Sequence, residues 1–198
     1  MLSEVQIKNK KFVIDGVKAV HHDHSTYTST WSNRPYLIRI FNDEAHYTKA
    51  LADYRTLKRA GINMAKICYH DDAQFTIIFD LFPEDDCLTD LSKGALSELH
   101  FESLFALYRF ARFSKVALDW EPQNFMLRGS QMFYLPTKWT PLTEESRFEK
   151  TEAYRTWFLG KEGRALLARK GFDISSLPSL SEAEVNKEMA LMAVRYYG

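Results

Sequence analysis

The stretch 117–127, which reads ALDWEPQNFML, limits the possible folds more than any other part of the chain. Asp119 and Asn124 stand five residues apart in it, with Pro122 between them and an apolar, strand-like run behind them. A long amphipathic segment, residues 99–116, comes before it. We therefore expect a helix, a polar loop and a short hairpin in succession. A loop of this length lets a base and a metal ligand face one cleft, although Asp and Asn are also common turn formers.

The first half of the chain alternates strand and turn signals. Residues 11–20, 25–31 and 36–41 are rich in β-branched and aromatic residues, and Asp15-Gly16 predicts a bend or bulge within the first run. We expect these three strands to form an antiparallel meander.

A helix is predicted next, over residues 44–59. Asn42 or Asp43 can cap its start and Gly61 can close its end. Two further strands are expected at 62–69 and 74–82, joined by a turn at Asp71-Asp72. Together these runs predict five antiparallel strands and one helix.

The second half is predicted to be mostly helical. A short helix starts at 88–91, the 99–116 helix follows, and a hairpin joins 125–127 to 131–135 after the polar loop. Residues 143–170 are expected to be helical, with an interruption near Gly160 and Gly163. A capping box, Ser181 with Glu184, opens a last helix that reaches Tyr196.

This order of elements and the Asp119-to-Asn124 loop resemble the protein-kinase-like superfamily. The Pro two residues before Asn124 is most similar to its aminoglycoside-phosphotransferase and small-molecule-kinase branch. The resemblance covers roughly residues 11–140. It implies an α+β, two-lobed fold: an N-lobe over 1–83 with a five-stranded antiparallel sheet and one helix, a hinge near 80–86, and a reduced, mostly helical C-lobe over 84–198 that carries the catalytic-loop-like segment 117–127.

The resemblance also implies roles for individual residues, with ATP and Mg²⁺ as cofactors. Asp119 matches the catalytic base, and Asn124 matches the metal ligand beside the cofactor. Arg39 stands where the family has a phosphate-binding Lys, and its planar guanidinium differs from a compact ammonium; the alternative is a strand residue that faces solvent. The acid on the following helix that would pair with Arg39 is either Glu44 or Asp53, unless both are solvated.

Three features of the family pattern are missing. The turn over residues 20–25, which would cover the phosphates, has no Gly. Pro136 or Thr137 stands where the family has its magnesium-binding Asp, and no Asp occurs between Asp119 and Asp173. Ala117 replaces the catalytic-loop His. Glu144 or Glu145 could in principle fold back as a substitute metal ligand.

These departures favour a pseudokinase-like binding or regulatory module with weak or no phosphoryl transfer, whose partner is a protein or a small molecule. Asp119 would then hold its loop through backbone N–H bonds. One alternative is a divergent, active phosphotransferase that uses Asp119 as base. Another, from outside the family, is a metal-dependent hydrolase built on His22, His24 and nearby acids, since the two His alternate onto one face of an extended strand.

The amino-acid composition limits the kinds of partner and the cellular compartment that we expect. The chain has 26 Lys and Arg residues and 26 Asp and Glu residues. It therefore has no excess of basic residues that would indicate binding to nucleic acid or to anionic lipid. Cys68 and Cys87 show no metal or redox spacing, which suits reduced, packed thiols. No leader pattern and no apolar run of membrane-spanning length is evident. We therefore expect a cytoplasmic protein.

Overall fold

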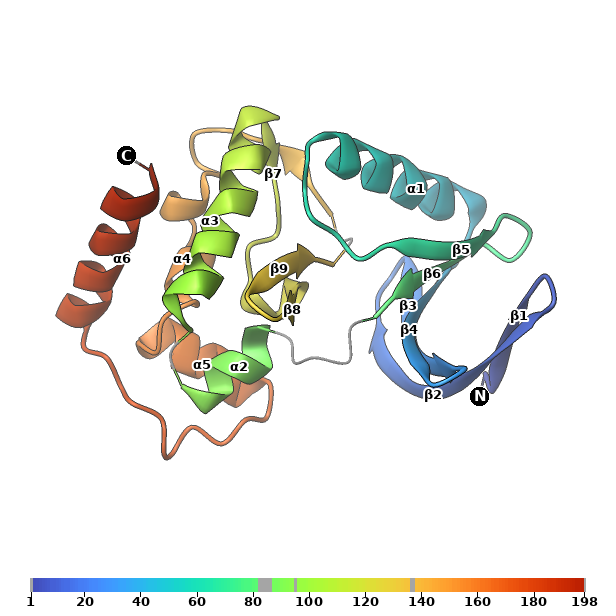
Figure 1. Cartoon of the computed structure of the whole chain (residues 1–198), viewed down its shortest axis with the longest axis horizontal. Coiled ribbons are helices and arrows are strands. Elements are labelled where there is room, and N and C mark those ends of the chain that lie inside the picture. The colour runs from blue at the N-terminus through green and yellow to red at the C-terminus, as the bar shows by residue number, and fades with distance from the viewer. Residues whose placement is uncertain (1, 82–86, 95, 136–137, 198) are drawn as a thin grey trace. The chain divides into compact units, whose positions relative to one another are not determined.

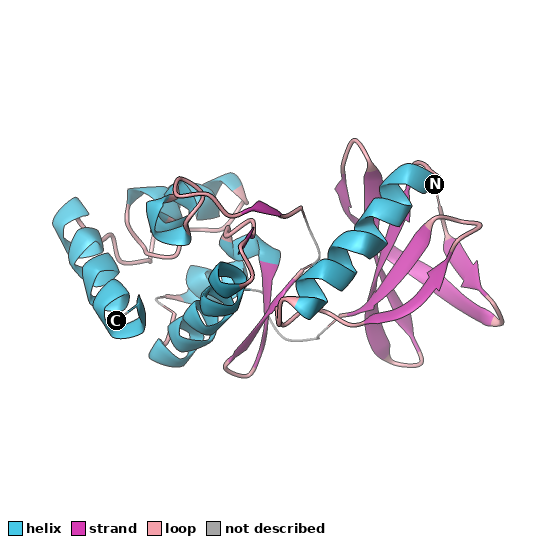
Figure 2. Cartoon of the chain, turned by 90° about the horizontal axis from the view of Figure 1, so that it is seen from above, coloured by secondary structure: helices cyan, strands magenta, loops and turns pink. Residues whose placement is uncertain are grey.

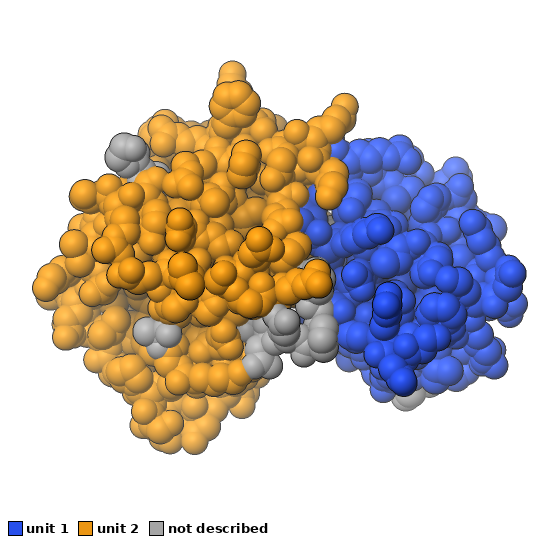
Figure 3. Space-filling model, in the orientation of Figure 1, with its two compact units in different colours: residues 1–56, 64–83 blue, residues 57–63, 84–198 orange. Residues whose placement is uncertain are grey.

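The computed structural model describes residues 2–81, 87–94, 96–135 and 138–197. It divides into two compact units (Figure 3). Unit 1 consists of residues 1–56 and 64–83, and unit 2 of residues 57–63 and 84–198. Most of the expected hinge, residues 82–86, lies outside the described part of the chain.

Unit 1 is built on a six-stranded antiparallel sheet, not the five-stranded sheet expected (Figure 1). The additional strand is β1, which pairs with β2 because Val5 and Ile7 alternate inward and are buried against Phe12. The bulge predicted at Asp15-Gly16 is present as a register shift between Ile14 and Gly16. In sheet order the strands are β1 (Glu4–Ile7), β2 (Lys10–Val20), β3 (His24–Trp31), β4 (Arg34–Phe41), β6 (Thr76–Asp80) and β5 (Ile67–Asp71).

The sheet curls around one of its own faces. Gln74 in the β5–β6 turn donates its Nε2 hydrogen to the Gln6 carbonyl of β1, at 2.8 Å. The Lys10 ammonium lies 4.4 Å from the Trp31 ring centroid and 4.3 Å from that of Tyr69, a cation–π contact on two sides. The enclosed face carries the core of the unit: Val5, Ile7, Phe12, Tyr36, Ile38 and Ile78.

Helix α1 (Glu44–Arg59) covers the other face and matches the predicted range (Figure 2). Ring pairs join it to the sheet, Tyr47 with Phe41 and Tyr54 with Phe79, at 6.0 and 6.4 Å. Because side chains alternate along β4, Arg39 projects on this helix-covered face, together with Phe41.

The ends of α1 are set by local sequence. Asp43 accepts the His46 N–H at 2.9 Å and so caps the first turn. Gly61 adopts φ +78° and donates to the Lys58 carbonyl at 3.2 Å, which closes the last turn in the left-handed conformation that favours Gly.

The fourth predicted strand is shorter than expected at its start, because β5 begins only at Ile67. Residues 57–63 belong to unit 2, where the Asn63 carbonyl accepts the Tyr134 N–H at 2.8 Å. The Asn63 side chain donates to the Met132 carbonyl at 3.1 Å. These bonds hold Asn63 to the hairpin instead of the sheet, whereas the Lys66 carbonyl accepts the Asp80 N–H of β6 at 2.9 Å.

Unit 2 is mostly helical, with two small two-stranded sheets. Its hairpin and its last helix with the Ser181–Glu184 capping box lie where the sequence predicts them. The elements are α2 (Cys87–Lys93), α3 (Glu98–Phe113), β7 (Val116–Ala117), η1 (Pro122–Asn124), β8 (Phe125–Arg128), β9 (Gln131–Tyr134), β10 (Thr140–Pro141), η2 (Phe148–Lys150), α4 (Glu152–Arg155), α5 (Lys161–Arg169) and α6 (Glu182–Tyr197).

The predicted helical segment 143–170 is instead three short helical pieces, η2, α4 and α5. Gly160 is extended, with φ −84° and ψ −162°, and separates α4 from α5. A Cβ there would lie 2.5 Å from Val185 Cγ2, so the break lets the start of α6 approach the chain closely. Gly163, by contrast, lies within α5. None of the helices in the described ranges is both long and apolar enough to cross a bilayer.

Gly163 provides a test of this packing. A Cβ at this position would lie 1.9 Å from the Phe158 carbonyl oxygen, which belongs to the backbone and cannot rotate away. Gly to Ala within a helix usually stabilises by about 0.5–1 kcal/mol. We expect Gly163→Ala instead to lower the free energy of unfolding by about 3 kcal/mol, the upper range for overpacking.

Urea denaturation measures this change, with Gly16→Ala as the control, because the nearest atom there would be 3.6 Å from the added Cβ. An increase in stability for Gly163→Ala would contradict the described packing of α5.

Candidate functional site

The loop that follows β7 and leads into β8 alternates buried and exposed positions. Leu118, Trp120 and Pro122 are buried, at 6% or less exposure for the first two, whereas Asp119 is exposed. Trp120 stacks on Phe125 at 5.8 Å between ring centroids. The apolar positions thus anchor the loop to unit 2 and turn the Asp119 side chain outward.

Three hydrogen bonds hold the backbone of this loop. The Asp119 N–H donates to the Tyr134 hydroxyl at 3.2 Å, and the buried Trp157 indole N–H donates to the Trp120 carbonyl at 2.7 Å. The N–H of Leu135 donates to the Asn124 carbonyl at 2.8 Å. The loop is therefore fixed at its start, middle and end.

Asp119 and Asn124, paired in the sequence prediction, are brought together. The Asn124 Nδ2 donates to the Asp119 backbone carbonyl at 3.2 Å, which fixes the amide and directs its Oδ1 away from that carbonyl. The Asp119 carboxylate accepts one backbone bond, from the Glu121 N–H, at a long 3.4 Å. Among the described residues this one long bond holds the exposed Asp119 carboxylate only weakly.

The loop itself has few carboxylates that could bind a metal ion. Glu121 already accepts from the Gln123 Nε2 at 2.6 Å. Pro136 and Thr137, the expected replacements for a metal-binding Asp, lie outside the described residues. Mg²⁺ is normally held through carboxylate and phosphate oxygens. Within this loop the described residues thus offer the Asn124 amide oxygen and the carboxylates of Asp119 and Glu121, which alone do not make a complete Mg²⁺ site.

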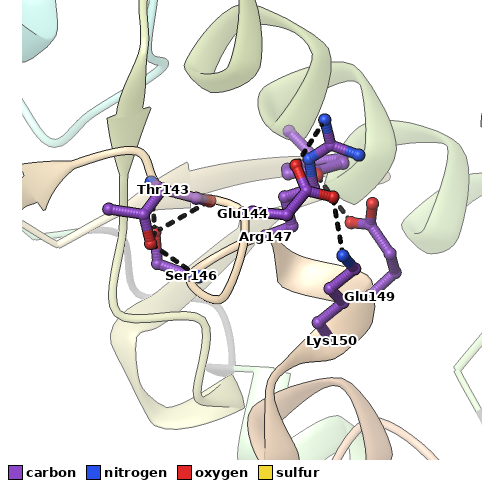
Figure 4. A network of polar contacts seen from close by, with 7 residues as sticks. Thr143, Glu144, Ser146, Arg147, Glu149 and Lys150 are labelled. Atoms are coloured by element: carbon purple, nitrogen blue, oxygen red, sulfur yellow. Dashed lines mark hydrogen bonds and ion pairs between the residues drawn. The ribbon is translucent and has the colours of Figure 1, made fainter.

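Glu144, one of the two proposed substitutes, is held in a local network (Figure 4). It pairs with Lys150 at 2.6 Å and with Arg147 at 2.8 Å. The hydrogen bond from Lys150 is the main reason that the pKa of the Glu144 carboxyl is lowered. The neighbouring Thr143 and Ser146 close the same turn through reciprocal bonds. A carboxylate held by two cations of its own turn is a poor candidate for a metal ligand.

Arg39 lies in unit 1, in the centre of β4, and is only 8% exposed. It stands opposite Thr26 on one side and Ile77 on the other. Its guanidinium carbon lies 5.5 Å from the Phe79 ring centroid. The alternative of a solvent-facing strand residue does not hold, because this charged side chain is buried on the helix-covered face.

The two candidate helix acids differ in burial. Glu44 is exposed in the first turn of α1. Asp53 is 20% exposed at its side chain and pairs with Lys49, at 2.5 Å, one turn earlier. Of the two, Asp53 has the partly buried environment that an acid paired with a buried cation would need.

The turn over residues 21–24 differs from the expectation that His22 and His24 share a face. The rings of His21 and His24 stack instead, at 4.6 Å, while the His22 side chain is 73% exposed. The residues form a turn in which the His21 N–H donates to the His24 carbonyl, so strand alternation does not apply. No group of three His, Cys, Asp or Glu that could hold a metal occurs among the described residues.

His24 is an unusual histidine. Its Nδ1 lies 2.9 Å from the Asp23 carboxylate, and its Nε2 is buried without a hydrogen-bond partner in the described part of the chain. Burial is the main reason that the pKa of the His24 imidazole falls from 6.5 to about 4, and the positive charge of Arg39 also lowers it, against the opposing effect of Asp23. His24 is therefore neutral at physiological pH, with the Nδ1 hydrogen directed at Asp23.

Sequence reasoning missed Tyr134 and Trp157, which hold the loop. Their partners lie 15 and 37 residues away along the chain, so no local spacing identifies them. The only signal available is that a buried Tyr or Trp usually needs a partner for its polar atom.

Comparisons with known proteins identify the fold. No protein-family model and no curated protein matches the sequence. The chain is similar to WaaP in its complex with acyl carrier protein, with a TM-score of 0.52 and 13% identity over 93% of this chain and 90% of that one. It is also similar to the BubR1 kinase domain, with a TM-score of 0.49 and 11% identity over 67% of this chain, a match that spans 48% of that domain. The fold is thus protein-kinase-like, and at this identity the likeness extends to the fold alone.

Tyr134→Phe tests how the loop is held. The substitution removes the oxygen that accepts the Asp119 N–H and leaves the ring in its buried place. We expect the free energy of unfolding to fall by about 1 kcal/mol. Amide hydrogen exchange should accelerate at Asp119 and stay unchanged at Arg128. Unchanged exchange at Asp119 would contradict the described bond.

His24→Gln tests the buried imidazole through pH. Because the unfolded chain takes up a proton near pH 6.5 and the folded protein only near pH 4, stability should fall as pH drops through this window. Between pH 7.5 and 4.5 we expect His24 to account for about 2–3 kcal/mol of the loss. The pKa of Asp23 is lowered from 3.8, so its own contribution is lost below this window.

Urea denaturation at the two pH values measures the difference, with the exposed His22→Gln as the matched control. A His24 ring that titrates near pH 6.5 by NMR would overturn the assignment.

Proposed function

We propose that the chain is a kinase-fold binding or regulatory module with weak or no phosphoryl transfer, whose partner is a protein or a small molecule. The observation that carries this proposal is the shortage of carboxylates around an otherwise ordered catalytic loop. Between Asp119 and Asp173 the chain has no Asp, and Glu121 and Glu144 are engaged by their own neighbours.

The shortage matters because phosphoryl transfer relies on positioning and charge neutralisation. Metal ions bridge the phosphates and offset the charge that develops in the transition state, and Asn124 alone offers one neutral oxygen. A centre of this kind is expected to lose several orders of magnitude in rate, since each 1.36 kcal/mol of lost stabilisation costs about tenfold.

The turn that would cover the phosphates supports the same conclusion. Its His21 N–H is already bonded within the turn, and the Asn42 side chain donates to the His22 carbonyl at 2.7 Å. The Asp23 carboxylate, 14% exposed, adds a negative charge at the tip. Backbone amides that approach a phosphate are usually supplied by Gly-rich turns, and an acid in the turn repels the phosphate.

One observation favours a second candidate, an active phosphotransferase with Asp119 as base. The Asp119 carboxylate is exposed and, from the residues that the structure describes, accepts a single long backbone bond, whereas a purely structural Asp would be held more firmly. Arg39 would then be the residue that contacts phosphate, in place of the Lys of related kinases.

Ligand-dependent stability distinguishes these two candidates. A nucleotide present at one hundred times its dissociation constant stabilises a folded protein by about 2.7 kcal/mol. For the binding module, we expect the increase in melting temperature with ATP to be no larger with Mg²⁺ than with EDTA. We also expect no turnover that depends on Asp119.

The variants for this experiment are Asp119→Asn and, as a matched control in the same loop, Glu121→Gln. Mg²⁺-dependent stabilisation together with turnover lost only in Asp119→Asn would reject the module and establish the phosphotransferase.

A further inference from the structure

Unit 2 has a partly enclosed cavity of 490 Å³, separate from the loop that carries Asp119 and Asn124. It lies between the start of α3, the turn that joins α4 to α5, and α6. Ligand sites in proteins typically measure about 300–1,000 Å³. The cavity is thus large enough for a small organic molecule.

The floor of the cavity is apolar. Phe101 of α3 stacks on Phe158 at 5.5 Å, and each ring is only 5% exposed. The Leu180 N–H donates to the Leu159 carbonyl at 3.0 Å, which ties the segment before α6 to the turn below. The other apolar residues of the lining are Leu96, Trp157 and Met192.

The rim is polar and carries more carboxylates than cations: Glu98, Glu184 and Glu188 against Lys187. Glu98 is paired with Arg195 at 2.7 Å, and Glu184 is bonded to Ser181 in the capping box. Glu188 makes no hydrogen bond or ion pair with any residue of the described ranges, and it stands one helical turn after Glu184. Like charges at this spacing repel each other, so a cation between them would be stabilised.

We propose that this cavity binds a small amphipathic amine. Its apolar body would lie against the stacked Phe101 and Phe158 rings, and its ammonium group would pair with Glu188 and Glu184 at the rim. An anion of the same shape would meet these two carboxylates and is excluded by the same charges.

The cavity is connected to the catalytic-like loop through one side chain. The Trp157 ring lines the cavity, and its indole N–H holds the Trp120 carbonyl at 2.7 Å. A molecule in the cavity therefore contacts the ring that fixes the middle of the loop. The indole N–H resonance of Trp157 gives a direct signal for binding that requires neither nucleotide nor activity.

Three probes of one shape test the proposal on the full chain: 4-phenylbutylamine, 4-phenylbutanol and 4-phenylbutanoate. Titrations are followed by the indole N–H signals, with Trp157 assigned from Trp157→Phe. We expect the amine to give a saturable shift and to bind about twofold to fivefold more tightly than the alcohol, the range for a rim ion pair. The carboxylate should bind more weakly than the alcohol.

Two variants locate the site. Glu188→Gln should remove the preference for amine over alcohol and leave alcohol binding unchanged, and this mild change at a partly exposed position keeps the fold. Met192→Trp should fill the cavity and abolish binding of all three probes. Leu191→Trp, at the adjacent position that is 53% exposed, is the matched control and should bind as the parent chain does.

The proposal is overturned if no probe gives a saturable Trp157 shift, if amine and carboxylate bind equally, or if a folded Met192→Trp still binds. Since no nucleotide is present, none of these outcomes depends on whether the chain is a binding module or a phosphotransferase.

Discussion

The hydrogen bond from the Trp157 indole to the Trp120 carbonyl is the interaction on which the loop of unit 2 depends. Both partners are buried, so a lost bond would leave a carbonyl without water or any other donor, at a cost of about 1–3 kcal/mol. Trp157 is itself fixed by edge contact with Phe125 at 5.3 Å. With Trp120 held inward, Asp119 faces outward, so the loop is ordered by contacts within unit 2.

An ordered loop does not by itself provide the groups needed for phosphoryl transfer. The amide of Asn124 is positioned by its bond to the Asp119 carbonyl, and Glu144, one of the expected substitute ligands, is paired with Arg147 and Lys150. Unit 1 shows the same separation of fold and chemistry. Arg39 occupies a buried strand position, while the neighbouring turn has His24 and Asp23 in place of flexible Gly. The fold therefore constrains the function less than the site residues do.

Elements with signals at both ends could be predicted from the sequence. Asp43 and Gly61 delimit α1, and Ser181 with Glu184 starts α6, because capping is a local interaction. Strand β1 was missed because only Val5 and Ile7 point inward. The interruption expected near Gly160 is present, where α6 packs closely, but Gly163 lies inside α5 and the rest of 143–170 is less helical than predicted. In the site, the spacing of Asp119 and Asn124 could be read from the loop. The hydrogen bonds by which Tyr134 and Trp157 hold the loop could not be predicted, because they join residues that are far apart in the sequence.

We propose that this kinase-like loop is ordered but does not bind a metal ion. The NMR signal of the Asn124 side-chain amide tests metal binding at the loop most directly. Mn²⁺, added with ATP in place of Mg²⁺, broadens the NMR signals of nuclei well beyond its own ligands, and most strongly those of the groups nearest to it. We predict that the Asn124 Nδ2 resonance broadens no more than that of Asn9, which lies between β1 and β2 of unit 1. Selective loss of the Asn124 signal at equimolar Mn²⁺ would contradict it.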